Sequence, residues 1–247
     1  MTDAVVRTSV DGAVATITLD RAEALNAITA EMLVQLGDAV AAFDEHPTVR
    51  VIVLTGAGRA FSAGVDLKAL GDRQLVDGAV GDVLDIPARA AIERITTSPR
   101  VVIAAVNGFC FTGALELALA CDLVIVATEA KLGDTHAKFG LRPTWGMSQR
   151  LPRAVGITRA RMLSYTASTF TGAQAAEWGL AVEHVPAEHL SDRVAEVAAQ
   201  IAANSAGSLA AYKQLYANHL DLTSGLALEA DSVFPIPDSN ERVAAFR

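Results

Sequence analysis

Two ionisable side chains, Glu116 and His136, have the types and surroundings that acid–base chemistry requires. Glu116 lies in GALELALACD, a segment that is apolar on nearly all sides. An ionised carboxylate in such a helix is strongly disfavoured unless it is paired or used chemically. The residue types leave two interpretations open: an arginine or backbone donors satisfy Glu116, or Glu116 is catalytic. Its position three residues after Gly113 favours catalysis, because the start of a helix can stabilise an oxyanion.

His136 lies between two glycines in GDTHAKFGLRPTWG, residues 133–146. Imidazole can exchange protons near neutral pH, since the reference pKa of histidine is about 6.5. The alternative is a polar loop residue that hydrogen-bonds nearby backbone. The residues around His136 do not by themselves decide between these two roles.

The hydrophobic pattern predicts an α/β core with a helical C-terminal region. Thr29 is predicted to cap a helix that runs to about Glu45, and another helix ends near Ser98-Pro99. From about residue 157 the chain is mostly helical. The predicted strands are AVVRTSV and AVATITL, joined by a hairpin turn at Asp11-Gly12, then VRVIVLTG, VVIAAV and DLVIVAT.

In two places an apolar strand leads through a tight turn of small residues into a predicted helix. The first turn is AGRAFSAGVDL, and the second ends at Gly113. The N–H groups at a helix start have no intrahelical partner and carry the positive end of the helix dipole. Both turns are therefore predicted to be able to hold an anion or a developing negative charge.

The glycine-rich stretch TGAGRAFSAG does not match a nucleotide-binding motif. Gly56 and Gly58 supply the first two glycines of a dinucleotide fingerprint, but Phe61 occupies the third position. A P-loop is excluded because Gly64 is followed by Val65 and not by lysine. The sequence also has no cysteine–histidine spacing typical of zinc and no Gly-x-Ser-x-Gly elbow.

The segment 71–86 is rich in glycine and aspartate and is predicted to be a mobile polar lid with solvated aspartates. No metal site is expected there, because the aspartate spacing matches no calcium loop. These aspartates are Asp72, Asp77, Asp82 and Asp85.

Composition excludes some partners and favours a reducing compartment. The formal net charge is −8, which argues against nucleic acid, because a polyanion is bound by an excess of lysine and arginine. Cys110 and Cys121 lie in apolar sequence and are expected to be buried thiols and not a disulfide. The N-terminus lacks the basic start and apolar run of a signal peptide, so a cytoplasmic location is expected.

The longest apolar stretch, residues 101–128, has the length of a membrane span. Asn107, Glu116 and Asp122 lie within it and would be unfavourable in hydrocarbon, and Asn107-Gly108 is a turn signal. We therefore predict a strand, a turn, a helix and a strand, with no membrane partner.

Two segments, AFSAGVDL (60–67) and AAVNGFCFTGALELALACDL (104–123), together resemble the crotonase, or enoyl-CoA hydratase/isomerase, superfamily. Its first coenzyme A loop is similar to DRAEALNAI (20–28), and its later segments are similar to GLRPTWGMSQRLPRAVG (140–156) and TGAQAAEWGLAVEHVP (171–186). The resemblance covers nearly the whole chain.

This resemblance implies a spiral of ββα units over residues 1–190 and a helical region over 191–247 that supports oligomerisation and covers the pocket. It further implies an acyl-CoA thioester substrate, as in fatty acid metabolism, and assembly into homotrimers or dimers of trimers. Coenzyme A would be part of the substrate, with no separate cofactor.

The resemblance also implies roles for individual residues. The N–H groups of Val65 and Gly113 would form an oxyanion hole for the thioester oxygen, and such donors typically contribute on the order of 3 kcal/mol each. Asp66 would organise its loop. The coenzyme A groove would be lined by Ala24, Leu25, Ala63 and Asp66, with Arg21 and Lys68 as candidate phosphate contacts.

Hydratases of this family commonly use two glutamates. One matches Glu116, and the position of the other falls without gaps on His136. A neighbouring carboxylate favours protonated imidazole, so we expect His136 to donate a proton and Glu116 to act as the base. The favoured function is reversible hydration of a 2-enoyl-CoA. The alternatives are a double-bond isomerase that uses Glu116 alone, a non-catalytic acyl-CoA binder, and thioester hydrolysis or decarboxylation.

Three departures from the family pattern affect these expectations. The turn before the catalytic helix reads Thr112-Gly113-Ala114 and is bulkier than the usual glycine-rich turn. Trp145 either narrows the acyl pocket or is a core residue. The sequence closes with ERVAAFR, where the family usually has a basic helix that helps to bind coenzyme A.

Overall fold

The computed structural model describes residues 4–68, 77–217, 222–239 and 241–242. Within these residues, the main sheet has six strands in the order β1-β2-β3-β5-β7-β10. Their bounds are β1 Val6–Asp11, β2 Val14–Leu19, β3 Val51–Gly56, β5 Val101–Val106, β7 Leu123–Ala127 and β10 Glu183–Val185. Only β1 and β2 pair antiparallel; the other neighbours are parallel.

The predicted hairpin is confirmed, with its turn one residue later than expected. Asp11 pairs with Val14, so the turn residues are Gly12 and Ala13. Gly12 has φ of +57°, a conformation that glycine adopts without strain.

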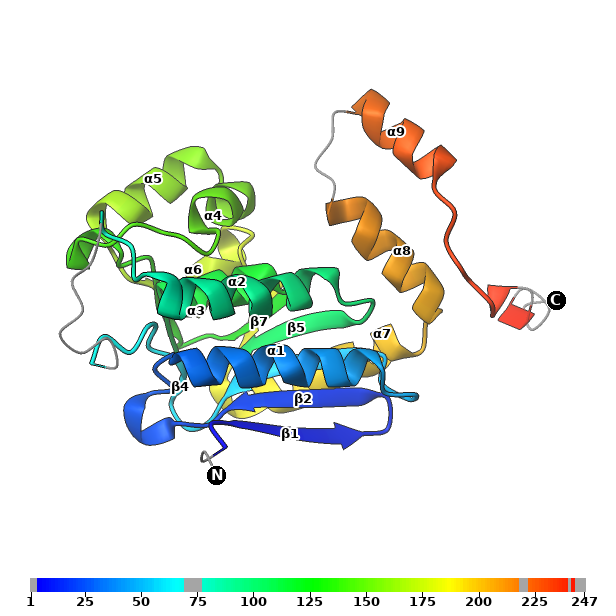
Figure 1. The fold of residues 1–247 in the computed structure, drawn as a ribbon, viewed down its shortest axis with the longest axis horizontal. Helices are drawn as coiled ribbons and strands as arrows, with labels where there is room; N and C mark the ends of the chain where they lie inside the picture. Colours follow the sequence, from blue (N-terminus) through cyan, green and yellow to red (C-terminus); the bar gives the residue numbers. More distant parts are fainter. Residues whose placement is uncertain (1–3, 69–76, 218–221, 240, 243–247) are drawn as a thin grey trace.

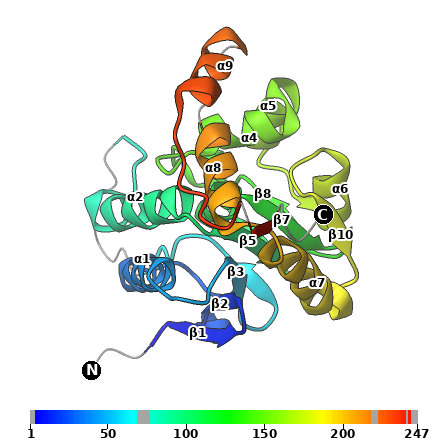
Figure 2. The same cartoon turned by 90° about the vertical axis from the view of Figure 1, so that its right-hand side faces the viewer.

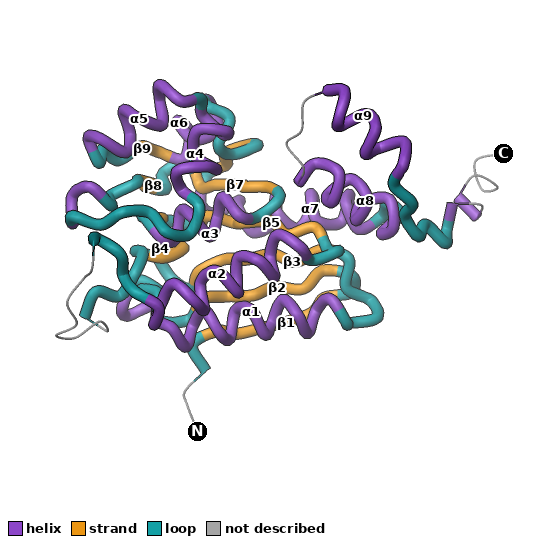
Figure 3. The backbone as a smooth tube through the Cα atoms, turned by 45° about the horizontal axis from the view of Figure 1, so that its top comes forward, coloured by secondary structure: helices purple, strands orange, loops and turns teal. Residues whose placement is uncertain are grey.

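A second, short-strand sheet lies beside the main one, in the order β4-β6-β8-β9 (Figure 3). It consists of β4 Ala60–Ser62, β6 Phe109–Phe111, β8 Lys131–Gly133 and β9 Phe170–Thr171. Each of β3, β5 and β7 runs on into the next strand of this sheet, and a helix follows. The predicted spiral of ββα units is therefore confirmed. The sequence prediction missed β4, β6 and β8, because three residues carry no readable periodicity.

Helices cover both faces of the main sheet. The α-helices are α1 Ala30–Asp44, α2 Asp82–Thr97, α3 Gly113–Ala120, α4 Met147–Val155, α5 Ile157–Thr166, α6 Gly172–Glu177, α7 Leu190–Ala202, α8 Ala206–Ala217 and α9 Leu222–Asp231, with short 3-10 turns η1 Ala22–Ala24, η2 Ala137–Phe139 and η3 Ala187–His189. Figure 2 shows α1 and α2 on one side of the sheet and α7 on the other. Thr29 caps α1 as predicted, because its Oγ1 accepts from the N–H of Met32 at 3.2 Å.

The two cysteines do not form a disulfide. Cys110 and Cys121 are free thiols, and burial raises the pKa of both. In the part of the chain that the structure describes, no helix combines the length and apolar character that crossing a bilayer requires.

The C-terminal helices α8 and α9 lie at one end of the main sheet (Figure 1), and α8 contacts β5. Residue 190, the predicted end of the core, is the first residue of α7, and α7 itself packs on the main sheet. The division into 1–190 and 191–247 remains a prediction.

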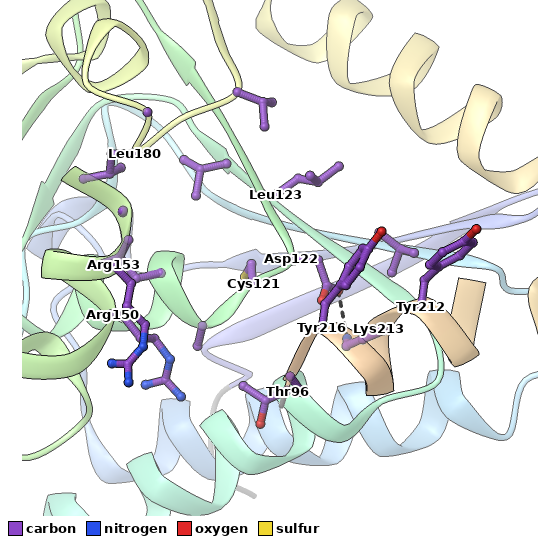
Figure 4. A pocket seen from close by; sticks show the side chains of 18 of the residues that line it. Thr96, Cys121, Asp122, Leu123, Arg150, Arg153, Leu180, Tyr212, Lys213 and Tyr216 are labelled. Atoms are coloured by element: carbon purple, nitrogen blue, oxygen red, sulfur yellow. Dashed lines mark ion pairs between the residues drawn. The ribbon is translucent and has the colours of Figure 1, made fainter. Parts of the chain in front are cut away.

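Lys213 holds α8 against the main sheet and α2 (Figure 4). Its Nζ lies 2.8 Å from Asp122 Oδ2 and donates to the carbonyls of Ile95 and Arg100, both at 2.9 Å. The side chain of Lys213 is only 9% exposed, so this ion pair is largely shielded from water. Removal of the lysine charge would leave the Asp122 carboxylate without its cation.

We expect Lys213→Met to lower the free energy of unfolding by about 3 kcal/mol, at the low end for a broken buried ion pair. Urea denaturation measures the change, and exposed Lys131→Met is the control. An unchanged transition would mean that the Lys213 ion pair contributes no net stability.

Candidate active site

Glu116 is held in the first turn of α3 by two backbone donors from the loop before α4. Its Oε1 accepts from the N–H of Trp145 at 3.0 Å and of Met147 at 2.9 Å. The residue is 1% exposed. Burial raises the pKa of this carboxyl, and the two donors and nearby His136 offset the rise only in part. Backbone donors therefore satisfy one oxygen, and the other is directed elsewhere.

That second oxygen faces His136. Glu116 Oε2 lies 3.6 Å from His136 Nε2, and His136 is 8% exposed. The separation exceeds a normal hydrogen bond, so the two groups lie close without being joined directly. The two residues singled out in the sequence, twenty positions apart, are thus brought together by α3 and the turn after β8.

Asp134 holds the other nitrogen of His136, a contact that the sequence prediction missed. His136 Nδ1 lies 2.7 Å from Asp134 Oδ1, and Ser164 Oγ donates to Asp134 Oδ2 at 2.6 Å. Burial alone would raise the pKa of Asp134, but the hydrogen bonds from His136 and Ser164 lower it below its usual value. The only sequence signal was an aspartate two residues before His136.

The two predicted oxyanion donors lie in turns that touch. A methyl group on Gly64 would lie 2.8 Å from the carbonyl oxygen of Phe111, so the backbones are in contact. Gly113 is the first residue of α3, where N–H groups have no intrahelical acceptor. The N–H of Ile28 donates to the carbonyl of Gly64 at 2.8 Å, and the carbonyl of Ile28 accepts from the N–H of Asp66 at 2.9 Å. In a parallel bridge of this kind, the N–H of Val65 points away from Ile28.

The helix predicted directly after the first turn is not found at residues 65–68. Val65 forms a β-bridge with Ile28, Leu67 and Lys68 form a turn, and residues 69–76 lie outside the described residues. Within the described residues, the first turn is therefore positioned by strand pairing.

Comparison with known proteins assigns the chain to a family. A family model described as enoyl-CoA hydratase/isomerase matches residues 9–236. The chain belongs to the enoyl-CoA hydratase/isomerase family. One relative is the Arabidopsis thaliana protein named probable enoyl-CoA hydratase 1, peroxisomal. It is 37% identical over 218 residues, which cover 88% of this chain and 80% of the relative. Crotonyl-CoA hydratase of Syntrophomonas wolfei is 33% identical over 244 residues, covering 94% and 90%.

Solved structures of the family share the fold. The enoyl-CoA hydratase of Bacillus anthracis matches with a TM-score of 0.87 at 33% identity, covering 92% of this chain and 88% of that chain. A putative enoyl-CoA hydratase of Thermobifida fusca in complex with CoA matches with a TM-score of 0.82 at 31% identity, covering 98% and 94%.

The residues expected to line the coenzyme A groove of this family member lie together. Ala63 N donates to Leu25 O at 2.9 Å, which joins the loop after η1 to the loop after β4. Ala24 is the last residue of η1. Asn26, which the sequence prediction did not single out, is fully buried and donates to the carbonyls of Ala57 and Ala60. These loops are therefore fixed by buried hydrogen bonds.

The two candidate phosphate contacts differ in their surroundings. Arg21 Nη1 lies 3.0 Å from Asp66 Oδ2 and donates to Ala27 O at 2.6 Å. Lys68 is exposed, and its backbone N–H donates to Asp66 Oδ1 at 3.1 Å. Asp66 thus links both segments, and Lys68 is the more accessible cation.

Trp145 is buried, 4% exposed, with its ring against Gly113. A methyl group on Gly113 would lie 2.5 Å from Trp145 Cζ3. Its Nε1 donates to Asp85 Oδ1 at 2.8 Å. The prediction that Asp85 is a solvated lid residue is wrong: it lies in the first turn of α2 and is 4% exposed. Asp82 is exposed in that turn, and Asp72 lies outside the described residues.

A cavity of about 330 Å³ adjoins His136 and its partner Asp134. His136 and Asp134 lie at its wall, and α4 and α5 contribute apolar side chains, among them Leu151 and Ile157. Its volume is at the small end of the range for ligand pockets.

In the described residues, no group of three or more histidine, cysteine, aspartate or glutamate side chains could hold a metal ion.

Proposed function

We propose that this protein catalyses the reversible hydration of a 2-enoyl-CoA thioester. The observation that carries the proposal is the buried pair of Glu116 Oε2 and His136 Nε2, 3.6 Å apart, with Glu116 in the first turn of the helix that begins at Gly113. Relatives named as enoyl-CoA and crotonyl-CoA hydratases support the reaction, and the match with a structure in complex with CoA supports the ligand.

In the proposed mechanism, a water molecule is bound between Glu116 and His136. Glu116 removes a proton from the water as its oxygen attacks Cβ of the enoyl group, and the electron pair of the double bond moves toward the thioester oxygen. The N–H groups of Val65 and Gly113 stabilise the resulting enolate-like charge. Protonated His136 gives a proton from Nε2 to Cα, and proton transfer from Glu116 back to His136 completes the cycle.

The environment of each group suits its proposed role. A buried carboxylate is a stronger base than an exposed one, and positioned proton transfer typically contributes 10² to 10⁴-fold in rate. Asp134 accepts from Nδ1 and fixes the ring so that Nε2 faces Glu116. Coenzyme A is part of the substrate, and no separate cofactor is required.

We expect Asp134→Asn to lower kcat by about 10²-fold, because the imidazolium loses its negative partner. The enoyl-CoA hydration rate across pH measures the effect, and exposed Asp192→Asn is the control. Ser164→Ala should have a smaller effect, because it removes one hydrogen bond to Asp134 and no charge. An Asp134→Asn variant with the wild-type rate and pH profile would exclude this role.

The alternative function is isomerisation of an enoyl-CoA double bond by Glu116 alone. It is favoured by the presence of histidine, and not a second glutamate, opposite Glu116. In this reaction one carboxylate would carry a proton between two carbons of the substrate, and His136 would hold that carboxylate in place.

The deciding experiment offers the purified protein trans-2-enoyl-CoA and trans-3-enoyl-CoA thioesters of short to medium chain length. Formation of 3-hydroxyacyl-CoA from the first supports the hydratase. Conversion of the second to the conjugated thioester, with the first unchanged, supports the isomerase. Tight acyl-CoA binding in calorimetry with neither conversion would identify a binder.

We also propose a homotrimer or a dimer of trimers in the cytoplasm. Helix α8 exposes Tyr212 by 56% and Tyr216 by 71%, and apolar surface of this kind is typical of protein contacts. Light scattering after size-exclusion chromatography tests the assembly, and a monomer at micromolar concentration would contradict it.

A further inference from the structure

We propose that Asp85 is a positioning residue of the active site, acting through Trp145 on both Glu116 and Gly113. The proposal rests on the function proposed above. It assigns a task to a buried carboxylate that takes no part in the chemistry and lies on α2, outside the segments that carry Glu116 and His136.

Asp85 is tied to the loop before α4 by two hydrogen bonds. Its Oδ1 accepts from Thr144 Oγ1 at 2.7 Å and from Trp145 Nε1 at 2.8 Å. A carboxylate that is 4% exposed requires such donors, because an unpaired buried charge is strongly disfavoured. The position of the indole ring is therefore coupled to α2.

Trp145 is in contact with both groups that the mechanism needs. Its backbone N–H donates to Glu116 Oε1 at 3.0 Å, and its ring lies against Gly113. On its other side, its carbonyl accepts from Arg150 Nη1 at 2.9 Å. A shift of this residue moves a donor of Glu116 and the surface that supports Gly113 together.

The orientation of Glu116 depends on this arrangement. Because Trp145 and Met147 hold Oε1, the remaining oxygen is directed at His136. A displacement of about 1 Å in a catalytic group can lower a rate by about 10²-fold. Loss of the hydrogen bond between the indole and Asp85 should therefore lower kcat and change KM much less.

The test compares Asp85→Ala, Trp145→Phe, their double variant and Asp85→Asn in enoyl-CoA hydration. Trp145→Phe keeps an aromatic ring and removes the Nε1 donor, and Asp85→Asn keeps the Oδ1 acceptor. Exposed Asp82→Ala, in the same turn of α2, is the matched control.

We expect Asp85→Ala and Trp145→Phe each to lower kcat roughly 10- to 100-fold, with KM changed less than about threefold. The double variant should be no slower than the slower single variant, because both single changes break the same hydrogen bond between Asp85 and Trp145. Asp85→Asn should stay within about threefold of wild type. Wild-type kcat in Asp85→Ala or Trp145→Phe, or effects that multiply in the double variant, would overturn the proposal.

A second measurement does not depend on turnover. Protein with nitrogen-15-labelled tryptophan gives backbone and indole N–H peaks for Trp145, and Trp178→Phe identifies them. Asp85→Ala should move the backbone peak of Trp145, which reports its bond to Glu116, although Asp85 bonds only to the indole of Trp145 and to the side chain of Thr144. An unmoved backbone peak would overturn the proposal. If wild type converts no enoyl-CoA, the hydratase function fails, and this peak alone decides whether Asp85 controls Trp145.

Discussion

Glu116→Gln is expected to lower kcat for enoyl-CoA hydration by about 10³-fold and to raise the melting temperature at neutral pH. The amide oxygen of glutamine can still accept from the N–H groups of Trp145 and Met147, so the loop before α4 keeps its position. The base that removes the proton from water is lost. KM should change little, because the predicted thioester donors are backbone groups.

The gain in stability follows from the sign of the pKa shift. Burial raises the pKa of Glu116 in the folded protein, so the folded state favours the protonated form more than the unfolded state does. Glu116 therefore destabilises the fold above its raised pKa, and this effect disappears below the ordinary glutamate pKa of about 4.3. The difference in melting temperature between variant and wild type should be largest at neutral pH and should vanish in acid.

Calorimetry across pH, beside hydration kinetics, measures both effects. Exposed Glu93→Gln is the control and should leave both quantities unchanged. A Glu116→Gln variant with wild-type kcat would exclude Glu116 as the base. A lower melting temperature at neutral pH would show that the charged carboxylate stabilises the fold.

His136→Ala is expected to lower kcat for hydration by about 10²- to 10³-fold. Among the described residues, the imidazole is the only basic side chain with a nitrogen within 4 Å of a Glu116 oxygen, and its Nδ1 lies 2.7 Å from Asp134 Oδ1. Without it, the proton for Cα must come from water. Exposed His189→Ala is the control, and hydration kinetics across pH is the measurement. An unchanged rate would mean that Glu116 works alone, as an isomerase would.

A charge-swap variant tests the same site more closely. His136→Glu restores the residue type that hydratases of the family commonly have there, but it brings a third carboxylate next to Asp134 and Glu116. We expect this variant to stay nearly inactive, because three buried carboxylates repel one another. The double variant with Asp134→Asn removes one of these charges and should recover part of the rate. Equal rates for His136→Glu and the double variant would contradict this account.

Local patterns in the sequence were sufficient to predict several elements of the fold. Thr29 marked the start of α1, because a cap is a short-range hydrogen bond. Buried parallel strands were readable as apolar runs, as in β3, β5 and β7. Glu116 was conspicuous because a carboxylate in an apolar helix violates the local pattern. The family motifs then gave the fold, and the match over residues 9–236 confirms the family.

The contacts that hold the site together depend on how distant segments pack in the folded protein. Asp134, Asp85 and Asn26 each look like ordinary loop or helix-start residues in the sequence, and each is buried in the fold. Asp85 meets Trp145 across 60 residues, and Glu116 meets Met147 across 31. Periodicity and caps report contacts within a few residues, whereas these bonds form only after the ββα units have stacked. The candidate catalytic residues could therefore be named from the sequence, and the residues that orient them could not.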